Sequence, residues 1–228
     1  MPKILVYCPL APTEPRIHPR TLASIMALEW DHPLTIVLDR EDMPAKPCQA
    51  TAYQNLTAKH NHARQMALDG DYDAVLFVEA DMVIPRHTLK RLDAVNADVA
   101  YGLYISRHKP HQWLAYSRLY GSGSGTSFSL MPEYCKAAWG SVVDSAGVGM
   151  GCTLVWRHVL EEIEFRCPSP HVADDWYFAL DAAEKGFKQK HDCGVVCGHV
   201  DGDTIYWPER NGGFSVQHTK LSKERIFA

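Results

Sequence analysis

The sequence has no long hydrophobic run. No apolar stretch in its 228 residues approaches the ~18 residues that a membrane-spanning helix needs. The first apolar stretch, Ile4 to Tyr7, is short, and no small-residue cleavage site follows it. This pattern predicts a first strand rather than a signal peptide. We therefore expect no transmembrane segment.

A cysteine framework and a large excess of one charge are also missing. The seven cysteines are an odd number spread along the chain, which fits a reducing compartment better than disulfide pairing. The expected location is the cytoplasm. The net charge of −4 argues against a dedicated nucleic-acid-binding protein, although it leaves a local basic patch open.

The composition is that of an ordinary globular protein. Hydrophobic residues make up 46% and charged residues 22%, which excludes a disordered or collagen-like chain. At ~150 residues per domain, the length fits one large domain or two small ones. Since we find no internal repeat and no linker, a single domain over residues 1–228 is the prediction.

Strands and helices alternate through the first hundred residues. Apolar runs and their boundaries predict strands at 3–8, 34–38, 74–78, 98–105, 147–156 and 195–199. Helical spacing predicts helices at 20–28, 53–68, 157–163 and 174–185, and one that starts at Pro85. Residues 106–140 are rich in Gly and Ser and predict a loop-rich insertion, and Gly212-Gly213 favours a flexible tail. The alternation predicts an α/β fold with a mainly parallel central sheet and helices on both faces.

Two carboxylates follow the most apolar strand. Glu79 and Asp81 come directly after the run Ala74 to Val78, and ligands of open α/β sheets bind beyond the carboxyl ends of strands. Residues two apart face the same side of a strand, where like charges repel unless a cation lies near them. Hard divalent cations prefer oxygen ligands and bridge to phosphates. A solvated acidic strand end explains the same pair equally well.

Two further features carry polar groups at element ends. His199 closes the last apolar strand, and imidazole suits Mn²⁺ beside carboxylates. It is one of 12 histidines, however, and a lone histidine is more often structural. Asp174-Asp175 opens a helix, where one aspartate as cap stabilises by about 1 kcal/mol. The other is then free to act as a base.

Four segments, in order, resemble a known family. Asn61 to Arg64 with Tyr72 to Met82 resembles the nucleotide-sugar half of GT-A glycosyltransferases, especially the family 2-like group, where the strand ends in an Asp-x-Asp-type motif. Gly147 to Arg157 is similar to that group's glycine-rich strand before a short helix. Asp174 to Phe178 resembles its acidic pair, and Cys197 to His199 its closing Gly-His. The likeness covers residues 3–200, and residues 106–140 have no match in it.

The resemblance implies a metal-dependent glycosyltransferase of the hexosyltransferase type, with a UDP- or GDP-sugar as donor. It divides the chain into a nucleotide-sugar-binding half (1–105), an acceptor and catalytic half (106–200) and a tail (201–228). By the same analogy, base and ribose would be held by Pro9, Leu10, Ala11 and Asp39. Arg64 would contact the nucleotide or diphosphate, and Glu79 and Ala80 would lie against the donor.

The resemblance also assigns the metal and the base. Asp81 and His199 would hold Mn²⁺ or Mg²⁺ on the diphosphate. Glu79 stands where the family has Asp, and its greater reach leaves open whether it ligates the metal directly or contacts metal-bound water or the ribose. In an inverting enzyme Asp175 would take the acceptor proton, with Asp174 as cap or support. In a retaining enzyme Asp175 would orient the acceptor.

The acceptor and two other functions stay open. The insertion at 106–140 either binds the acceptor or is a solvated loop, and its aromatic and basic residues are Arg107, His108, Lys109, His111, Trp113, Tyr116, Arg118 and Tyr120. The acceptor hydroxyl would belong to a glycan, a small molecule or, less favoured, a nucleic acid. A nucleotidyltransferase on a similar sheet would need Arg16 and Arg20 to grip phosphate. A non-catalytic nucleotide-sugar-binding module is the third alternative.

Overall fold

A computed structural model describes residues 2–10, 17–40, 52–118, 128–129, 136–147, 149–168 and 172–219. Within these ranges, no helix has both the length and the apolar character that crossing a membrane requires.

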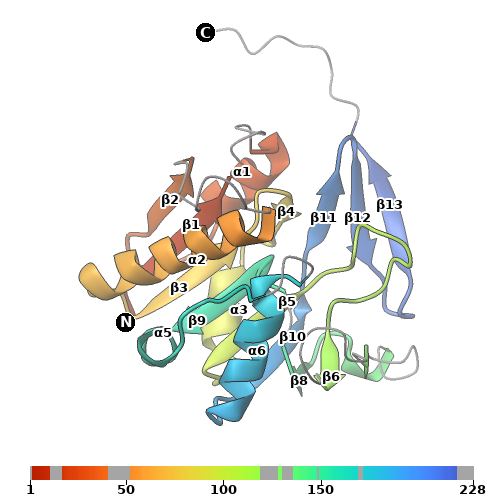
Figure 1. Ribbon diagram of the computed structural model, residues 1–228. Helices are drawn as coiled ribbons and strands as arrows, with labels where there is room; N and C mark the ends of the chain where they lie inside the picture. The colour runs from red at the N-terminus through yellow and green to blue at the C-terminus, as the bar shows by residue number, and fades with distance from the viewer. Residues whose placement is uncertain are drawn as a thin grey trace, which may run out of the picture.

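A seven-stranded sheet forms the centre of the molecule (Figure 1), in the order β2-β1-β3-β9-β5-β10-β8. Its strands are β1 (Ile4–Pro9), β2 (Thr35–Asp39), β3 (Ala74–Val78), β5 (Val99–Leu103), β8 (Val142–Asp144), β9 (Cys152–Trp156) and β10 (Gln189–Val196). β1 pairs in parallel with β2 and β3, and β10 with β5. β9 runs antiparallel between β3 and β5, and β8 antiparallel along β10. Strands β1, β2, β3, β5 and β10 thus run the same way, and the predicted α/β class is confirmed.

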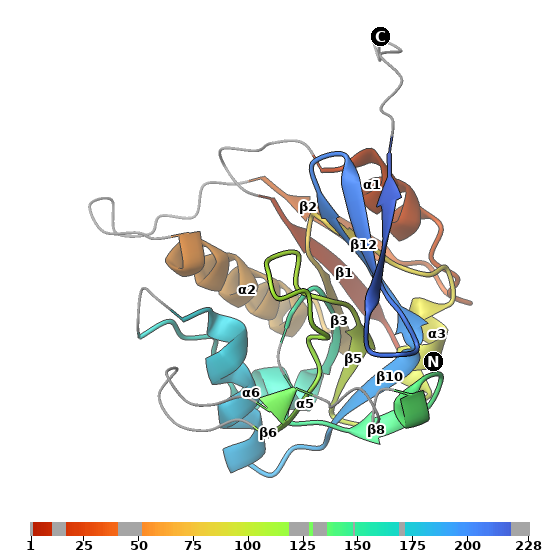
Figure 2. The same ribbon diagram turned by 90° about the vertical axis from the view of Figure 1, so that its right-hand side faces the viewer.

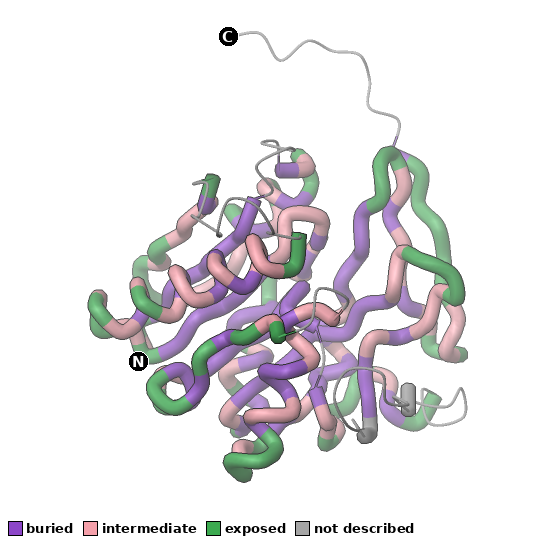
Figure 3. The backbone as a smooth tube through the Cα atoms, viewed as in Figure 1, coloured by how far each residue is buried: buried purple, intermediate pink, exposed green. Residues whose placement is uncertain are grey.

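Helices cover both faces of this sheet, as Figure 2 shows. Alternation along β1 points Ile4 and Val6 to one face and Leu5 and Tyr7 to the other, so each face has its own apolar core. The first core includes residues of α1 (Pro19–Met26) and α3 (Thr88–Asp93), and the second residues of α2 (Ala52–Asp69), α5 (Arg157–Glu162) and α6 (Asp174–Glu184). Every residue of β1, β3 and β5 is buried (Figure 3), as expected for strands covered on both faces.

A smaller sheet stands beside the first (Figure 1), in the order β13-β12-β11-β4. Its strands are β4 (Met82–Val83), β11 (Gly198–Asp201), β12 (Thr204–Pro208) and β13 (Phe214–His218), and all pairs are antiparallel. The short strands β6 (Tyr116–Arg118) and β7 (Phe128–Ser129) pair with each other. Residues 204–218 of the expected flexible tail form a β-hairpin, β12 and β13, with Gly212-Gly213 in its turn.

Three element predictions need correction. The strand expected at 147–156 begins only at Cys152. The expected final strand at 195–199 is two strands, because β10 ends at Val196 and β11 begins at Gly198 in the other sheet. The backbone N–H of Cys197 still donates to Leu103 of β5, and the β10 register shifts just before it. The helix expected from Pro85 begins at Thr88 with His87 as N-cap, since Pro85 lies in the turn before it.

This topology opens one edge of the central sheet as a site. Parallel strands present their carboxyl ends at the same edge. The segments that leave β1, β3, β5 and β10 there carry Leu10, Glu79, Arg107 and His199. Residues far apart in the sequence therefore meet at this edge.

Candidate active site

A cleft of about 1260 Å³ lies at the carboxyl edge of the sheet. It is bounded by the segments after β1 and β3, the first turns of α2 and α6, the segment after β5 and the end of β11. Of the predicted site residues, it is lined by Pro9, Leu10, Glu79, Ala80, Asp81, Asp174 and Asp175. Its position agrees with the rule that α/β sheets bind ligands beyond strand ends.

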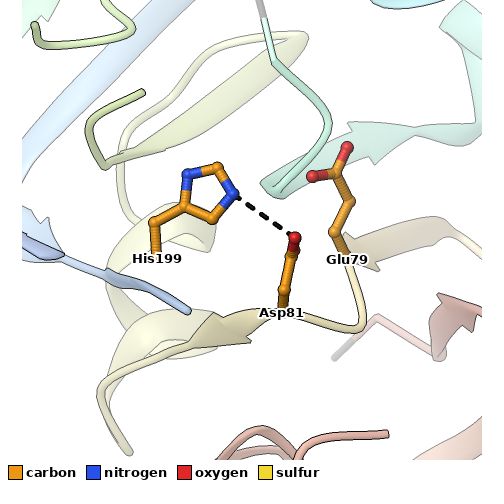
Figure 4. A group of neighbouring side chains, drawn as sticks. All are labelled: Glu79, Asp81 and His199. Carbon is orange, nitrogen blue, oxygen red and sulfur yellow. Dashed lines mark ion pairs between the residues drawn. The ribbon is translucent and has the colours of Figure 1, made fainter. Parts of the chain in front are cut away.

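The three predicted metal ligands come together beside this cleft (Figure 4): Glu79 and Asp81 line it, and His199 is buried behind them. One ligand atom each from Glu79, Asp81 and His199 lies within 4.8 Å of the other two. The Nε2 atom of His199 is 3.4 Å from Oδ2 of Asp81. Pairing of β4 with β11 causes this approach, since His199 lies opposite Met82, the residue after Asp81.

The donor set fits a divalent cation. The Nδ1–H of His199 donates to the carbonyl of Ile105 over 2.7 Å, which leaves Nε2 as the ring nitrogen that faces Asp81 and that a cation would bind once its proton has left. A backbone hydrogen bond of this kind commonly orients a metal-binding histidine. Oδ1 of Asp81 is buried and has no hydrogen-bond partner among the described residues. Two carboxylates and one imidazole are ligands that Mn²⁺ accepts, and the carboxylates also suit Mg²⁺.

Charges in the cluster shift the pKa values in opposite directions. Burial, together with the charge of Asp81, raises the pKa of Glu79 to about 7. Burial alone would raise the pKa of Asp81, but the hydrogen bond and charge of His199 outweigh it and lower that pKa. Burial would lower the pKa of His199, and Asp81 reverses this effect. A cation that binds here therefore replaces protons on Glu79 and His199.

Arg107 adds a positive charge beside the cluster. Its Nη1 atom forms an ion pair with Oδ2 of Asp81, and both side chains are partly exposed. The sequence places Arg107 in the insertion as an acceptor candidate, whereas the structure brings it to the predicted metal ligands. No local pattern reveals this pairing, because it depends on how the segment after β5 folds back over the edge of the sheet.

The acidic pair at the head of α6 divides into two environments. Ala173, rather than Asp174, is the N-cap of α6, and both aspartates lie in its first turn. Asp174 is fully buried and pairs with His60 of α2, Nδ1 to Oδ2, over 2.8 Å. Burial, and then the charge of Asp174, raises the pKa of the partly exposed Asp175 to about 6. His60 is a cleft residue that the sequence does not reveal, since nothing distinguishes it from the other histidines.

Two residues expected to contact the donor have other partners. The buried carboxylate of Asp39 receives contacts from Lys59, His62 and Tyr7. The Nε–H of Arg64 donates to the carbonyls of Leu160 and Ile163 at the end of α5. Neither Asp39 nor Arg64 lines the cleft. Ala11, also expected to contact the donor, lies outside the described residues.

The described part of the 106–140 insertion is mixed in character. Arg107 and His108 line the cleft, and His111 stacks on Tyr206 of β12 with ring centroids 4.6 Å apart. Trp113 and Tyr116 are buried, so they serve as core residues rather than as an exposed stacking surface. Tyr120 and the side chain of Arg118 lie outside the described residues.

Comparison with known proteins shows the fold. No family model matches the chain, and no curated protein sequence matches it. Among solved structures, A197 from STIV aligns with a TM-score of 0.63 and 16% identity, over 99% of this chain and 98% of that chain. GalNAc-T7, solved with UDP, GalNAc and Mn²⁺, aligns with a TM-score of 0.55 and 8% identity, over 88% of this chain and 44% of that chain. The chain has a GT-A-like α/β fold. At these identities the likeness extends to the fold alone.

Proposed function

We propose that this protein is a metal-dependent glycosyltransferase that moves a sugar from a UDP- or GDP-sugar to an acceptor hydroxyl. The observation that carries the proposal is the convergence of Glu79, Asp81 and His199 within 4.8 Å, with Glu79 and Asp81 lining a cleft of about 1260 Å³. The cleft lies where a GT-A-like sheet presents its strand ends. The solved structure of GalNAc-T7, which has this fold, contains UDP, GalNAc and Mn²⁺, and this supports the choice of ligands.

The part of the cleft beside Glu79, Asp81 and Arg107 suits the diphosphate that leaves the sugar. Breaking the bond between sugar and diphosphate leaves negative charge on an oxygen atom, which a bound divalent cation stabilises as a Lewis acid. Asp81 and His199 would hold that cation, with Glu79 as a third ligand. Arg107 brings a guanidinium to the same cleft, and this group suits phosphate oxygens.

The acceptor end needs a group that takes a proton. Asp175 lines the cleft, and its pKa of about 6 leaves it mostly ionised at neutral pH. A carboxylate in this state accepts a proton from a positioned hydroxyl and contributes about 10²–10⁴-fold to the rate. Asp175 is the general base of an inverting transfer in this proposal, and the acceptor is a glycan or small-molecule hydroxyl.

The nucleotidyltransferase alternative receives no specific support. It needs a basic loop after β1, but Arg16 lies outside the described residues. Arg20 is exposed on α1 and does not line the cleft. Lys59, which does line it, is buried against Asp39. In the described part of the cleft, the positive charge that could bind phosphate would therefore come from a cation held by the three metal ligands and from Arg107.

A panel of nucleotide sugars tests the proposal. We expect a UDP- or GDP-sugar to raise the melting temperature in the presence of Mn²⁺, since a ligand at 100 times its dissociation constant adds about 2.7 kcal/mol to the free energy of unfolding. Slow release of nucleoside diphosphate should accompany binding. Asp81→Asn should abolish both effects, because it removes a ligand and a negative charge. Asp71→Asn is the matched control, since its side chain is 92% exposed and lies away from the cleft.

Three outcomes would contradict the proposal. Release of pyrophosphate instead of nucleoside diphosphate would identify a nucleotidyltransferase. Tight binding without turnover, unchanged by Asp175→Asn, would identify a binding module. If no nucleotide sugar binds with or without Mn²⁺, the donor assignment is wrong.

A further inference from the structure

A histidine and an aspartate form a buried pair in the wall of the cleft. Nδ1 of His60 lies 2.8 Å from Oδ2 of Asp174, and each side chain is 1% exposed. The pair joins α2 to the first turn of α6, and both residues line the cleft. Asp175, the proposed base, follows Asp174 directly.

The imidazole of His60 and the carboxylate of Asp174 are buried and hydrogen-bonded to each other. The ring of His60 packs against Phe77 and Phe165, with centroids 5.3 and 5.1 Å away. Its Nε2 and the Oδ1 of Asp174 are buried and find no hydrogen-bond partner in the described part of the chain. A buried carboxylate is costly unless a positive charge compensates it. The compensation available to Asp174 is the imidazolium form of His60.

The charges around His60 favour that form. The groups that act on it are Asp174 and Asp175 of α6 and Glu79 after β3. Burial opposes the charge and lowers the pKa of His60, but these three carboxyl groups outweigh it and raise the pKa. These carboxyl groups therefore favour the positively charged form of His60 over its neutral form.

We propose that His60 is a positioning residue for catalysis: as an imidazolium it balances Asp174, holds the first turn of α6, and keeps the adjacent Asp175 in place and ionised. This inference rests on the proposed function for the role of Asp175. Two neighbouring carboxylates oppose each other's ionisation. His60 reduces this conflict by placing a positive charge against the one that faces the core, so the other stays available to the acceptor.

The first test needs no substrate. With ¹³C-labelled aspartate, the carboxyl carbon of Asp175 is followed against pH by NMR and assigned with Asp175→Asn. We expect His60→Gln to move its titration upward by about one pH unit, because Asp174 is then an uncompensated neighbour. The double variant His60→Gln with Asp174→Asn removes both charges and should return the titration close to the wild-type position.

A matched control separates this effect from the loss of any histidine. His158 pairs with Asp98 over the same 2.8 Å, but its side chain is 53% exposed and it lies outside the cleft. His158→Gln should leave the Asp175 titration unchanged. If His60→Gln does not fold, Asp174→Asn alone still tests the inference. It removes the negative charge without changing the shape of the side chain, and should lower both the pKa of His60, read from labelled imidazole, and that of Asp175.

The second test uses turnover. The acidic limb of the pH profile of kcat should move upward in His60→Gln by about one pH unit, with kcat about fivefold lower at about pH 6 and the donor KM within about twofold. The double variant should recover the limb. A residue that only stabilises the fold would lower the melting temperature without moving the limb.

Failures of the two proposals are distinguishable. An Asp175 titration that His60→Gln leaves unchanged overturns the role of His60, whatever the enzyme does. If that titration shifts as expected but no nucleotide sugar is turned over, the charge coupling stands and the proposed function is wrong.

Discussion

Neighbouring acidic residues in this cleft have very different environments. Glu79 has a pKa raised to about 7, chiefly by burial, whereas Asp81 two residues later has its pKa lowered by His199 and Arg107 against the effect of burial. Asp175 has a pKa of about 6, raised first by burial and then by Asp174. Perturbed carboxyl groups that gather in a cleft are a mark of a functional site.

Asp175 should make the protein less stable at neutral pH. Its folded pKa of about 6 lies above the ordinary 3.8, so the stability that its proton contributes is complete below about pH 4 and is lost as the pH rises through about 6. Asp175→Asn should therefore raise the free energy of unfolding by about 3 kcal/mol at about pH 7.5, with a gain below about 1 kcal/mol at about pH 4. Urea unfolding at the two pH values measures this.

The control for that comparison is Asp144→Asn. The Asp144 side chain is 94% exposed, so its replacement should change the stability little at either pH. If Asp175→Asn and the wild type have the same free energy of unfolding at both pH values, ionised Asp175 does not destabilise the folded protein.

The glycine-rich segment before β9 shows how one element positions a ligand. The predicted strand at 147–156 begins only at Cys152, and Gly149 and Gly151 before it lie against Tyr104. The N–H of Gly151 donates to the Tyr104 hydroxyl, and its carbonyl accepts from the N–H of Glu79 over 3.1 Å. Gly149 and Gly151 lack a Cβ and can therefore approach the Tyr104 ring closely. The hydrogen bond between Gly151 and Glu79 holds the end of β3, where two of the proposed metal ligands lie.

A methyl group in this segment should be costly. Gly149 has a φ of +104°, and a Cβ there would overlap the Tyr104 hydroxyl. Gly149→Ala should lower the free energy of unfolding by about 3 kcal/mol, through both strain and overlap. Gly140→Ala separates the two, because Gly140 has a φ of +78° with nothing within 4 Å of its Cβ position. That variant should cost about 1 kcal/mol. Equal losses in thermal unfolding would show that Tyr104 yields without cost.

At the scale of the whole molecule, the proposed metal ligands come from both sheets. Glu79 follows β3 of the central sheet, whereas His199 belongs to β11 of the smaller one. A cation held by both would tie the sheets together. The assignment of residues 1–228 to one domain, divided near residues 105 and 200, remains a prediction.

Mn²⁺ should consequently protect β11 and β4 from local opening. With Mn²⁺ at 100 times its dissociation constant, the folded state should gain about 2.7 kcal/mol, and this should slow amide exchange in these strands by about 100-fold. β13, the far edge of the sheet with all five residues exposed, should change little. Hydrogen exchange read by mass spectrometry checks this, and Asp81→Asn should show no protection. Uniform slowing across both sheets, or none at all, would argue against an ion between them.

The sequence by itself determined the α/β class and the approximate place of the strand-end carboxylates. Apolar runs such as Ala74 to Val78 and the polar residues that end them are local features, and burial on two faces requires that pattern. Only the tertiary structure decided which side chains meet. His60 with Asp174, Arg107 with Asp81, and Asp39 with Lys59 are pairs of residues distant in sequence. Such pairs follow from helix placement and strand order, which no local pattern encodes.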